Sequence, residues 1–155
     1  MKNTHTLHLL IDLQTKQLNN LLENVTDEIS NQEKNNLNSI KWLVGHLVNT
    51  RLIILSTLTK TPSDPEFAKL FGRDSSGKID SNFPTIEELK EKWNETSDKI
   101  ALEFNTKSNE DFNEKSPIPF PVGDDTLIGF ISYLVYHEAF HIGQISIVKR
   151  VVNIN

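Results

Sequence analysis

Four segments of this sequence repeat apolar residues at steps of three and four, which is the pattern of a helix with one buried face. The first segment predicts a helix over about residues 4–25, in which Gln14 is the one polar residue on the apolar stripe. The stripe itself consists of Leu7, Ile11, Leu18, Leu21 and Val25, and it is widened by Leu10, Leu13 and Leu22.

The second predicted helix begins after a cap at Asn38 or Ser39 and continues to about Thr59. Because it is apolar around much of its circumference, we expect it to have neighbours on several sides. A short helix over 65–71 should follow, since Asp64 suits the N-cap and the proline after it suits the first helical position.

The third predicted helix starts at a capping box, Thr85–Glu88, and the fourth runs from about Thr126 to Val152 after a cap at Asp124 or Asp125. The buried stripe of the third helix is expected to contain Ile86, Leu89, Trp93, Thr96, Ile100 and Phe104. That of the fourth is expected to contain Leu127, Phe130, Leu134, His137, His141, Gln144 and Val148.

The remaining stretches predict connections between these helices. Residues 27–36 are polar and rich in asparagine, and residues 106–125 alternate prolines with apolar residues, which favours an extended segment. With four long helices and no convincing strand, the sequence predicts an all-α four-helix bundle that forms a single domain over residues 1–155. Two of its connections are long, and one of them carries the short extra helix.

Composition narrows the classes of function. The chain has no cysteine, which removes thiolate nucleophiles and cysteine metal ligands and suits a reducing compartment. Its 16 Lys and Arg against 21 Asp and Glu give a formal net charge of -5, which disfavours binding to nucleic-acid phosphates. The longest apolar run, 52–55, is too short to cross a bilayer, and the N-terminus lacks the features of a signal peptide. We therefore expect a cytoplasmic protein that binds neither nucleic acid nor membranes.

Three histidines carry the candidate chemistry. His137 and His141 are four residues apart, so their imidazoles lie on the same face of the fourth helix, one turn apart. His46 lies on an apolar seam of the second helix. Catalytic metal sites commonly use three protein ligands and keep one position open, and helical bundles build such sites from facing helices. The sequence therefore predicts a divalent metal ion bound by these three side chains.

Each histidine can instead pack in the core as a neutral ring that is hydrogen-bonded to a backbone or hydroxyl group. Three neutral imidazoles in one core need several buried polar partners, however, and each unsatisfied group costs about 1–3 kcal/mol. A shared metal ion satisfies three nitrogens at once, which favours the metal site. His5 and His8 lie near the chain start, where fraying is expected, and are not expected to be ligands.

Other polar residues lie one turn from the histidines. Gln144 can line the cavity or hydrogen-bond to a ligand histidine, and Asn49 and Thr50 are candidates for the cavity rim. Tyr133 can present its hydroxyl group to the site or bury its ring in the core. Glu138 is turned about 100° from the ligand face, so we expect it at the surface. None of these residues is identified as a general base, and the catalytic groups are not predicted.

The motifs around the histidines resemble the DinB/YfiT-like family of metalloenzymes, which is related to thiol-dependent S-transferases. The resemblance rests on Trp42-Leu43-Val44-Gly45-His46 and on Tyr136-His137-Glu138-Ala139-Phe140-His141-Ile142-Gly143-Gln144. Phe71-Gly72-Arg73 and Phe83-Pro84-Thr85 are also similar to that family, and the likeness covers nearly the whole chain.

This resemblance implies a four-helix bundle in which His46, His137 and His141 bind a divalent metal, often nickel or zinc. Iron is a further candidate, because imidazole suits several divalent ions. It also implies a homodimer, because members of the family are frequently dimeric. Characterised relatives include transferases and isomerases that use bacillithiol or mycothiol.

The leading hypothesis is therefore a metal-dependent transferase that activates an external low-molecular-weight thiol against a small-molecule substrate. A metal-dependent hydrolase would use the same ligands, so it remains an alternative. A non-catalytic bundle that binds a metal or another ligand, or a structural bundle without metal, remains another.

Overall fold

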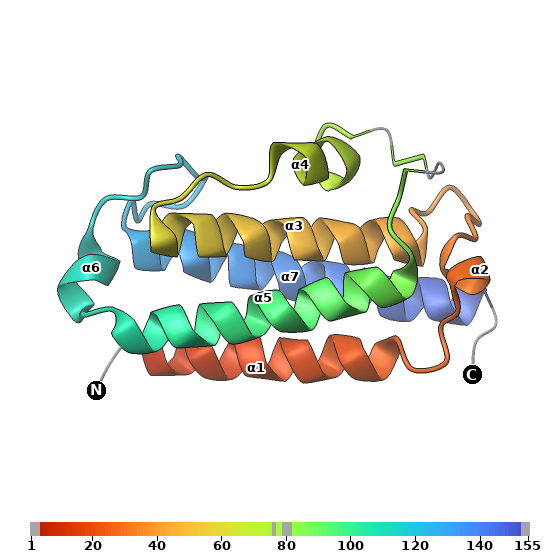
Figure 1. The fold of residues 1–155 in the computed structure, drawn as a ribbon, viewed down its shortest axis with the longest axis horizontal. Helices are drawn as coiled ribbons and strands as arrows, with labels where there is room; N and C mark the ends of the chain where they lie inside the picture. The colour runs from red at the N-terminus through yellow and green to blue at the C-terminus, as the bar shows by residue number, and fades with distance from the viewer. Residues whose placement is uncertain (1–3, 76, 79–81, 153–155) are drawn as a thin grey trace.

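The computed structural model describes residues 4–75, 77–78 and 82–152. Its helices are α1 (Thr4–Leu21), α2 (Asp27–Ser30), α3 (Ile40–Thr59), α4 (Pro65–Phe71), α5 (Ile86–Thr106), α6 (Asn109–Asn113) and α7 (Leu127–Val151) (Figure 1). Helices α1, α3, α5 and α7 are long and lie side by side as a bundle. The described residues contain no strand, apart from an isolated bridge between Lys115 and Thr126. The predicted all-α bundle is confirmed.

The long helices run in two directions. In Figure 1, α1 and α7 run from left to right, whereas α3 and α5 run from right to left. Helix α3 packs against both α5 and α7, and α1 packs against the same two helices from the other side. The connection from α3 back to the start of α5 therefore returns along the whole bundle, and it carries α4 across the outer face of α3.

The helix starts follow the sequence at most positions. The Ser39 hydroxyl accepts a hydrogen bond from the Trp42 amide, and Asp64 caps α4. Thr85 and Glu88 form the predicted capping box at the start of α5. The cap of α7 differs from the prediction, because Thr126 is the N-cap rather than either preceding aspartate. Asp124 supports this cap indirectly, because its carboxylate accepts hydrogen bonds from both the backbone amide and the hydroxyl group of Thr126.

Helix α1 ends at Leu21, about four residues before its predicted end. Leu22 and Val25 are buried as expected, but they lie in a turn that includes Asn24 at a positive φ of 62°. The predicted widening of the stripe is wrong at Leu10 and Leu13, which are 40% and 59% exposed. A narrow apolar face is enough here because α1 contacts α5 and α7 along one side.

Two stretches that were predicted as plain connections each contain a short helix. Helix α2 lies within 27–36, and α6 lies within 106–125. The Asp27 carboxylate accepts hydrogen bonds from Lys41 Nζ at 2.6 Å and from the Ile86 amide at 2.8 Å. This one side chain therefore holds α2 against the start of both α3 and α5.

The apolar core is divided into two clusters along the bundle axis. One cluster contains Leu18, Leu47, Trp93 and Ile145, and the other contains Ile11, Ile54, Ile100 and Phe130, among other residues. On each long helix the residues between the two clusters include buried polar side chains: Gln14 on α1, Arg51 on α3, Ser97 on α5 and Glu138 on α7. A polar layer therefore crosses the middle of the bundle.

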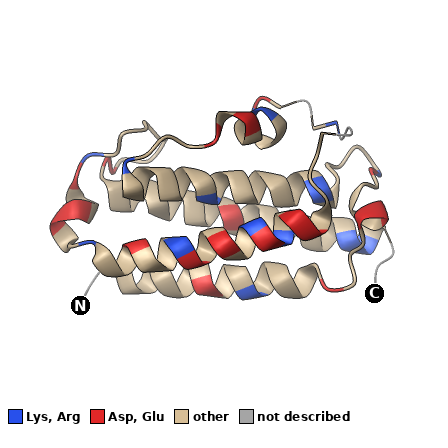
Figure 2. Cartoon of the chain, in the orientation of Figure 1, with Lys and Arg blue, Asp and Glu red and all other residues tan. Residues whose placement is uncertain are grey.

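Charge is distributed unevenly over the helices. Figure 2 shows many acidic and basic residues along α5 and on the short helices, whereas α3 and α7 are mostly uncharged. None of the described helices is both long and apolar enough to cross a membrane.

Candidate metal centre

Helices α3 and α7 bring the three predicted histidines together. His46 is buried on α3, while His137 and His141 are half-buried on α7. The ring centroids are 5.1 Å apart for His46 and His137, 4.8 Å for His46 and His141, and 4.4 Å for His137 and His141. The arrangement follows from the i, i+4 spacing on one helix and from direct packing between the two helices.

The nitrogen atoms of these rings converge. One ring nitrogen from each histidine lies within 4.8 Å of the others, and the Nε2 atoms of His46 and His137 are 2.9 Å apart. Imidazole nitrogens bind zinc at about 2.0–2.1 Å, so closing the three rings around one ion requires shifts of about an ångström. Among the described residues, this is the group of side chains that can hold a metal ion.

The backbone of α4 orients His46. Its Nδ1 lies 2.7 Å from the carbonyl oxygen of Phe71, which can only accept a hydrogen bond, so Nδ1 carries the proton and donates. The lone pair is then on Nε2, the atom that points toward His137. The Trp42 ring stacks on the His46 ring, with centroids 5.0 Å apart. A hydrogen bond to a backbone carbonyl is a common way to fix the tautomer of a metal-binding histidine.

Gln144 has the same role for His141. The Gln144 Oε1 atom lies 2.6 Å from His141 Nδ1, so with this amide orientation Nδ1 donates and Nε2 keeps its lone pair. Two of the three histidines therefore have the protonation that a metal ligand requires. The donor set therefore fits a divalent ion.

The surroundings also keep the rings neutral. Burial lowers the pKa of His46 and of His141. Burial, with smaller contributions from the charges of His141 and His46, lowers the pKa of His137 to about 4. Neutral imidazole is the form that binds a metal, so three neutral rings at pH 7 favour a cation at their centre.

A cavity of about 640 Å³ opens beside the histidines. Among the sequence candidates, Asn49, Thr50 and Tyr133 border this cavity, whereas Gln144 reaches the site through His141. Thr50 donates its hydroxyl proton to the backbone carbonyl of His46, so its oxygen is engaged within α3. The full lining is Trp42, His46, Asn49, Thr50, Ile53, Arg73, Pro121, Tyr133, Leu134, His137 and His141. Arg73 and Pro121 come from the two long connections, which therefore border the site.

The expectation that Glu138 lies at the surface is wrong. Its side chain is completely buried, and its carboxylate pairs with the equally buried guanidinium of Arg51 at 3.2 Å. Burial raises the pKa of Glu138, and the neighbouring guanidinium opposes that rise. Being turned away from the ligand face does not mean facing water, because on this side α7 faces the interior of the bundle.

The ion pair between Glu138 and Arg51 limits which reactions the site can catalyse. The segment from His137 to His141 has the His-Glu-x-x-His order of zinc peptidases, in which the glutamate is a general base. Here the glutamate does not border the cavity, and its oxygens are engaged by Arg51. The motif therefore supplies two candidate ligands but no base that reaches the cavity.

Arg51 was not identified from the sequence as a site-supporting residue. Besides Glu138, it donates to the carbonyl oxygen of Ile11 and to the hydroxyl groups of Thr15 and Ser97, and it lies over the Trp93 ring. It thus joins all four long helices directly behind the histidines. An arginine within an otherwise apolar helix is a signal that could have identified it.

The remaining candidates lie away from the histidines. His5 is exposed, and His8 lies 3.9 Å from Asp12 on α1. Gln14, the polar residue on the apolar stripe of α1, donates to the carbonyl oxygen of Val135. None of these residues borders the cavity.

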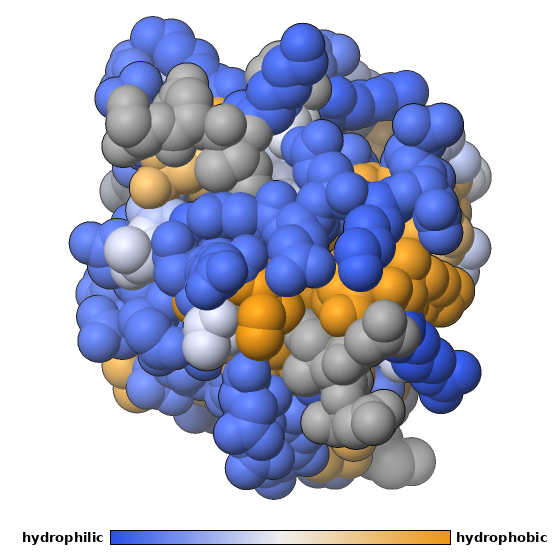
Figure 3. Space-filling model, turned by 90° about the vertical axis from the view of Figure 1, so that its right-hand side faces the viewer, coloured by the Kyte–Doolittle hydropathy of each residue, from blue (hydrophilic) through white to orange (hydrophobic). Residues whose placement is uncertain are grey.

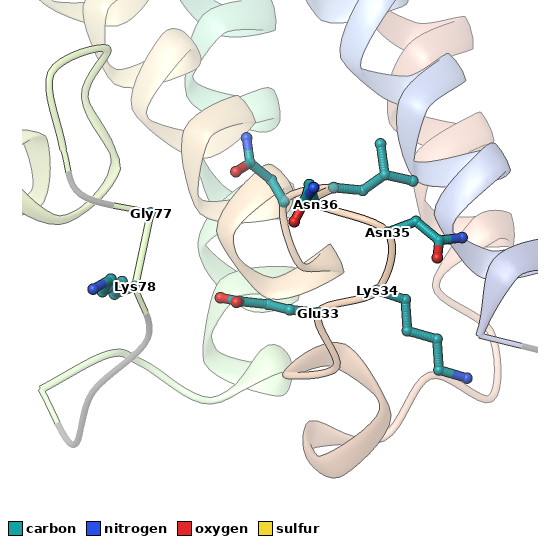
Figure 4. A pocket seen from close by; sticks show the side chains of 8 residues that line it. Glu33, Lys34, Asn35, Asn36, Gly77 and Lys78 are labelled. Atoms are coloured by element: carbon teal, nitrogen blue, oxygen red, sulfur yellow. The ribbon is translucent and has the colours of Figure 1, made fainter.

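A second hollow, of about 440 Å³, lies between the loop before α3 and residues 77–78 (Figure 4). In Figure 4 Glu33 points toward the side of residues 77–78, whereas Lys34 points away from them. This hollow contains no histidine and lies apart from the candidate metal centre.

Comparison with known proteins gives a family and a fold. A sequence model of the DinB superfamily matches residues 10–145. A conserved protein from Enterococcus faecalis, known from a crystal structure, has the same fold, with a TM-score of 0.70 over 98% of both chains and 16% sequence identity. Among curated proteins, none matches this sequence.

Proposed function

Since the chain belongs to the DinB superfamily, we propose that it is a metal-dependent transferase whose nucleophile is a low-molecular-weight thiol. His46, His137 and His141 would hold the divalent ion, for which nickel and zinc are the first candidates and iron the next. When bound, such an ion acts as a Lewis acid that favours the ionised form of a thiol. The thiol must come from outside, because the chain has no cysteine.

The observation that carries this proposal is the protonation of the ligand set. Phe71 and Gln144 each accept a hydrogen bond from Nδ1 of one histidine, which leaves Nε2 free to bind a cation. The Nε2 atoms of His46 and His137 are 2.9 Å apart, which without a metal is an N–H···N hydrogen bond donated by His137, and a shared cation would take the place of that proton. The cavity volume also lies within the range of small-molecule sites, about 300–1,000 Å³.

The lining residues favour a thiol over water as the nucleophile. Hydrolysis normally uses a positioned general base to take a proton from water, and among the described residues no carboxylate borders the cavity. A thiol is much more acidic than water, so it depends less on such a base. Besides the histidines and Arg73, the described cavity lining includes the titratable side chain of Tyr133, whose hydroxyl group is well suited to orient a substrate.

Paired turnover assays test this function. Protein reconstituted with nickel or zinc is assayed on electrophilic substrates with and without an added low-molecular-weight thiol, beside the His137→Ala variant. We expect turnover that requires both the thiol and the intact ligand set. Turnover of the same substrate without any thiol would contradict the transferase and favour the hydrolase.

We also propose that the protein forms a homodimer through α7. Tyr136, Phe140 and Ile147 lie on one face of that helix at steps of four and seven, and they are 71%, 56% and 56% exposed. Figure 3 views the end of the bundle near α2 and shows apolar surface among mostly hydrophilic residues. The same face on a second copy offers a matching apolar stripe, which suits an interface with two-fold symmetry.

A further inference from the structure

Arg73 places a positive charge at the border of the cavity, and its position in the sequence gives no indication of this. Among the described residues that line the cavity, it is the one with a formal charge, and none is an aspartate or glutamate. This is unusual for a chain whose formal net charge is -5. A cavity with a guanidinium at its border and neutral imidazoles in its wall attracts anions.

The backbone around Arg73 is fastened on both sides. Before it, the Phe71 carbonyl accepts from His46, and the Gly72 amide donates to the Ala68 carbonyl at 2.7 Å. After it, the Ser75 amide donates to the Gly72 carbonyl at 3.1 Å, and the Ser75 hydroxyl accepts from the Trp42 indole at 2.9 Å. These contacts fix the backbone of the loop at the cavity border, from which the exposed Arg73 side chain extends.

The guanidinium of Arg73 has no carboxylate partner among the described residues, in contrast to Arg51, which is paired with Glu138. A planar guanidinium with free donors is the side chain best suited to bind a carboxylate through two parallel hydrogen bonds.

Asn49 provides a second, independent observation. It lies on α3, three residues after His46, and its side chain is 5% exposed and borders the same cavity. Its amide has no hydrogen-bond partner within the described part of the chain. The polar atoms of this amide are open to the cavity, because the buried side-chain atoms without a partner are on Gln14 and Trp93 rather than on Asn49. A ligand in the cavity would supply the partner.

We propose that Arg73 and Asn49 recognise the carboxylate group of a small anionic substrate, which they hold beside the three histidines. This inference rests on the proposed function, because it names the class of substrate for the same cavity. The carboxylate can belong to the thiol or to the second substrate. Arg73 binds its charge at the cavity border, and the Asn49 amide donates to it from the cavity wall.

The test compares two probes that differ in one charge. Binding of 3-mercaptopropionate and of the neutral 3-mercaptopropionamide is measured by calorimetry on zinc-reconstituted protein. We expect the carboxylate probe to bind about five- to tenfold more tightly, which is the size of one partly exposed charged hydrogen bond. Arg73→Gln should bring this ratio close to one, and Arg73→Lys should restore part of it. Arg150→Gln, a matched change of an exposed arginine at the far end of α7, should keep the ratio of the unmodified protein.

A second arm removes the thiol and the metal. Propionate and propionamide are titrated into metal-free protein while the Asn49 side-chain amide is followed by NMR. We expect propionate to shift this amide in the unmodified protein and much less in Arg73→Gln. A shift with propionate would locate carboxylate recognition in the chain itself, whichever substrate carries the group.

The outcomes separate this inference from the proposed function. Equal, zinc-dependent binding of both thiol probes would overturn carboxylate recognition and leave the thiol function standing. A preference for the carboxylate that persists in Arg73→Gln would also overturn it. Propionate binding that depends on Arg73, without any zinc-dependent binding of the thiols, would support carboxylate recognition and contradict the thiol function.

Discussion

Arg51 has no contact with solvent, and its charge is stabilised by one carboxylate and several hydroxyl and carbonyl oxygens. Removing one partner of a buried ion pair leaves the other charge without compensation, which costs about 3–5 kcal/mol. Glu138→Ala should therefore lower the free energy of unfolding by about that amount in chemical denaturation. Glu95→Ala, which breaks an exposed pair with Lys99, should have a much smaller effect, because exposed ion pairs contribute little to stability. Equal effects of the two changes would contradict the central role of the buried pair.

The lowered pKa of His137 makes the stability of the folded protein depend on pH. In the unfolded chain its pKa is near 6.5, whereas in the folded, metal-free protein burial lowers it to about 4. Between these values the unfolded state binds a proton that the folded state does not, so the free energy of unfolding should decrease as the pH falls from about 6.5 to 4. His137→Asn should make this slope shallower in urea unfolding measured across that range. An unchanged slope would show that His137 is not buried as a neutral ring.

For single residues, the sequence predicted the histidine cluster correctly but placed Glu138 wrongly at the surface. The i, i+4 pair and an apolar seam around His46 are local patterns, so they can be recognised from spacing. The position of Glu138 depends on an arginine 87 residues away in the chain, and no local pattern reports that distance. Arg73 and Pro121 reach the cavity from connections whose path depends on the whole fold.

Among the helices, α4 both packs against α3 and orients a histidine of the candidate metal centre. Its Phe71 ring lies against Gly45, where a methyl group would overlap the ring, and its Phe71 carbonyl orients His46. Gly45→Ala should therefore lower the free energy of unfolding by about 1–3 kcal/mol and weaken metal binding, because it displaces both the ring and the carbonyl.

Gly123→Ala is the matched control for that change, since nothing lies within 4 Å of the added methyl group. It should change the free energy of unfolding by less than about 0.5 kcal/mol. Thermal or chemical unfolding of both variants, with calorimetry of metal binding, checks the pair. If Gly45→Ala were as mild as Gly123→Ala, the close contact between α3 and α4 would be contradicted.

The long elements were predictable because their apolar spacing and their caps agree, as at Ser39 and Thr85. The short helices α2 and α6 were not, since four or five mostly polar residues are too few to show a periodicity and are held by contacts made elsewhere. The Asp27 carboxylate illustrates this, because its partners on α3 and α5 come from later in the chain.

For the whole molecule, the proposed homodimer gives a direct expectation. Ile147→Asp places a charge on the exposed apolar face of α7 and should convert a dimer into a monomer in sedimentation experiments. Leu102→Asp, at a leucine of α5 that is 66% exposed, should leave the dimer intact. A monomeric unmodified protein at micromolar concentration, or a dimer that tolerates Ile147→Asp, would contradict this interface.

The proposed chemistry requires the three histidines to act as one metal site between α3 and α7. Metal content after reconstitution with nickel, zinc or iron salts and removal of unbound ions tests this most directly. We predict about one divalent ion per chain in the unmodified protein and in His8→Ala, and none in the variant with His46, His137 and His141 all replaced by alanine. Absence of bound metal from the unmodified protein, or full metal content in the triple variant, would contradict a metal site at these histidines.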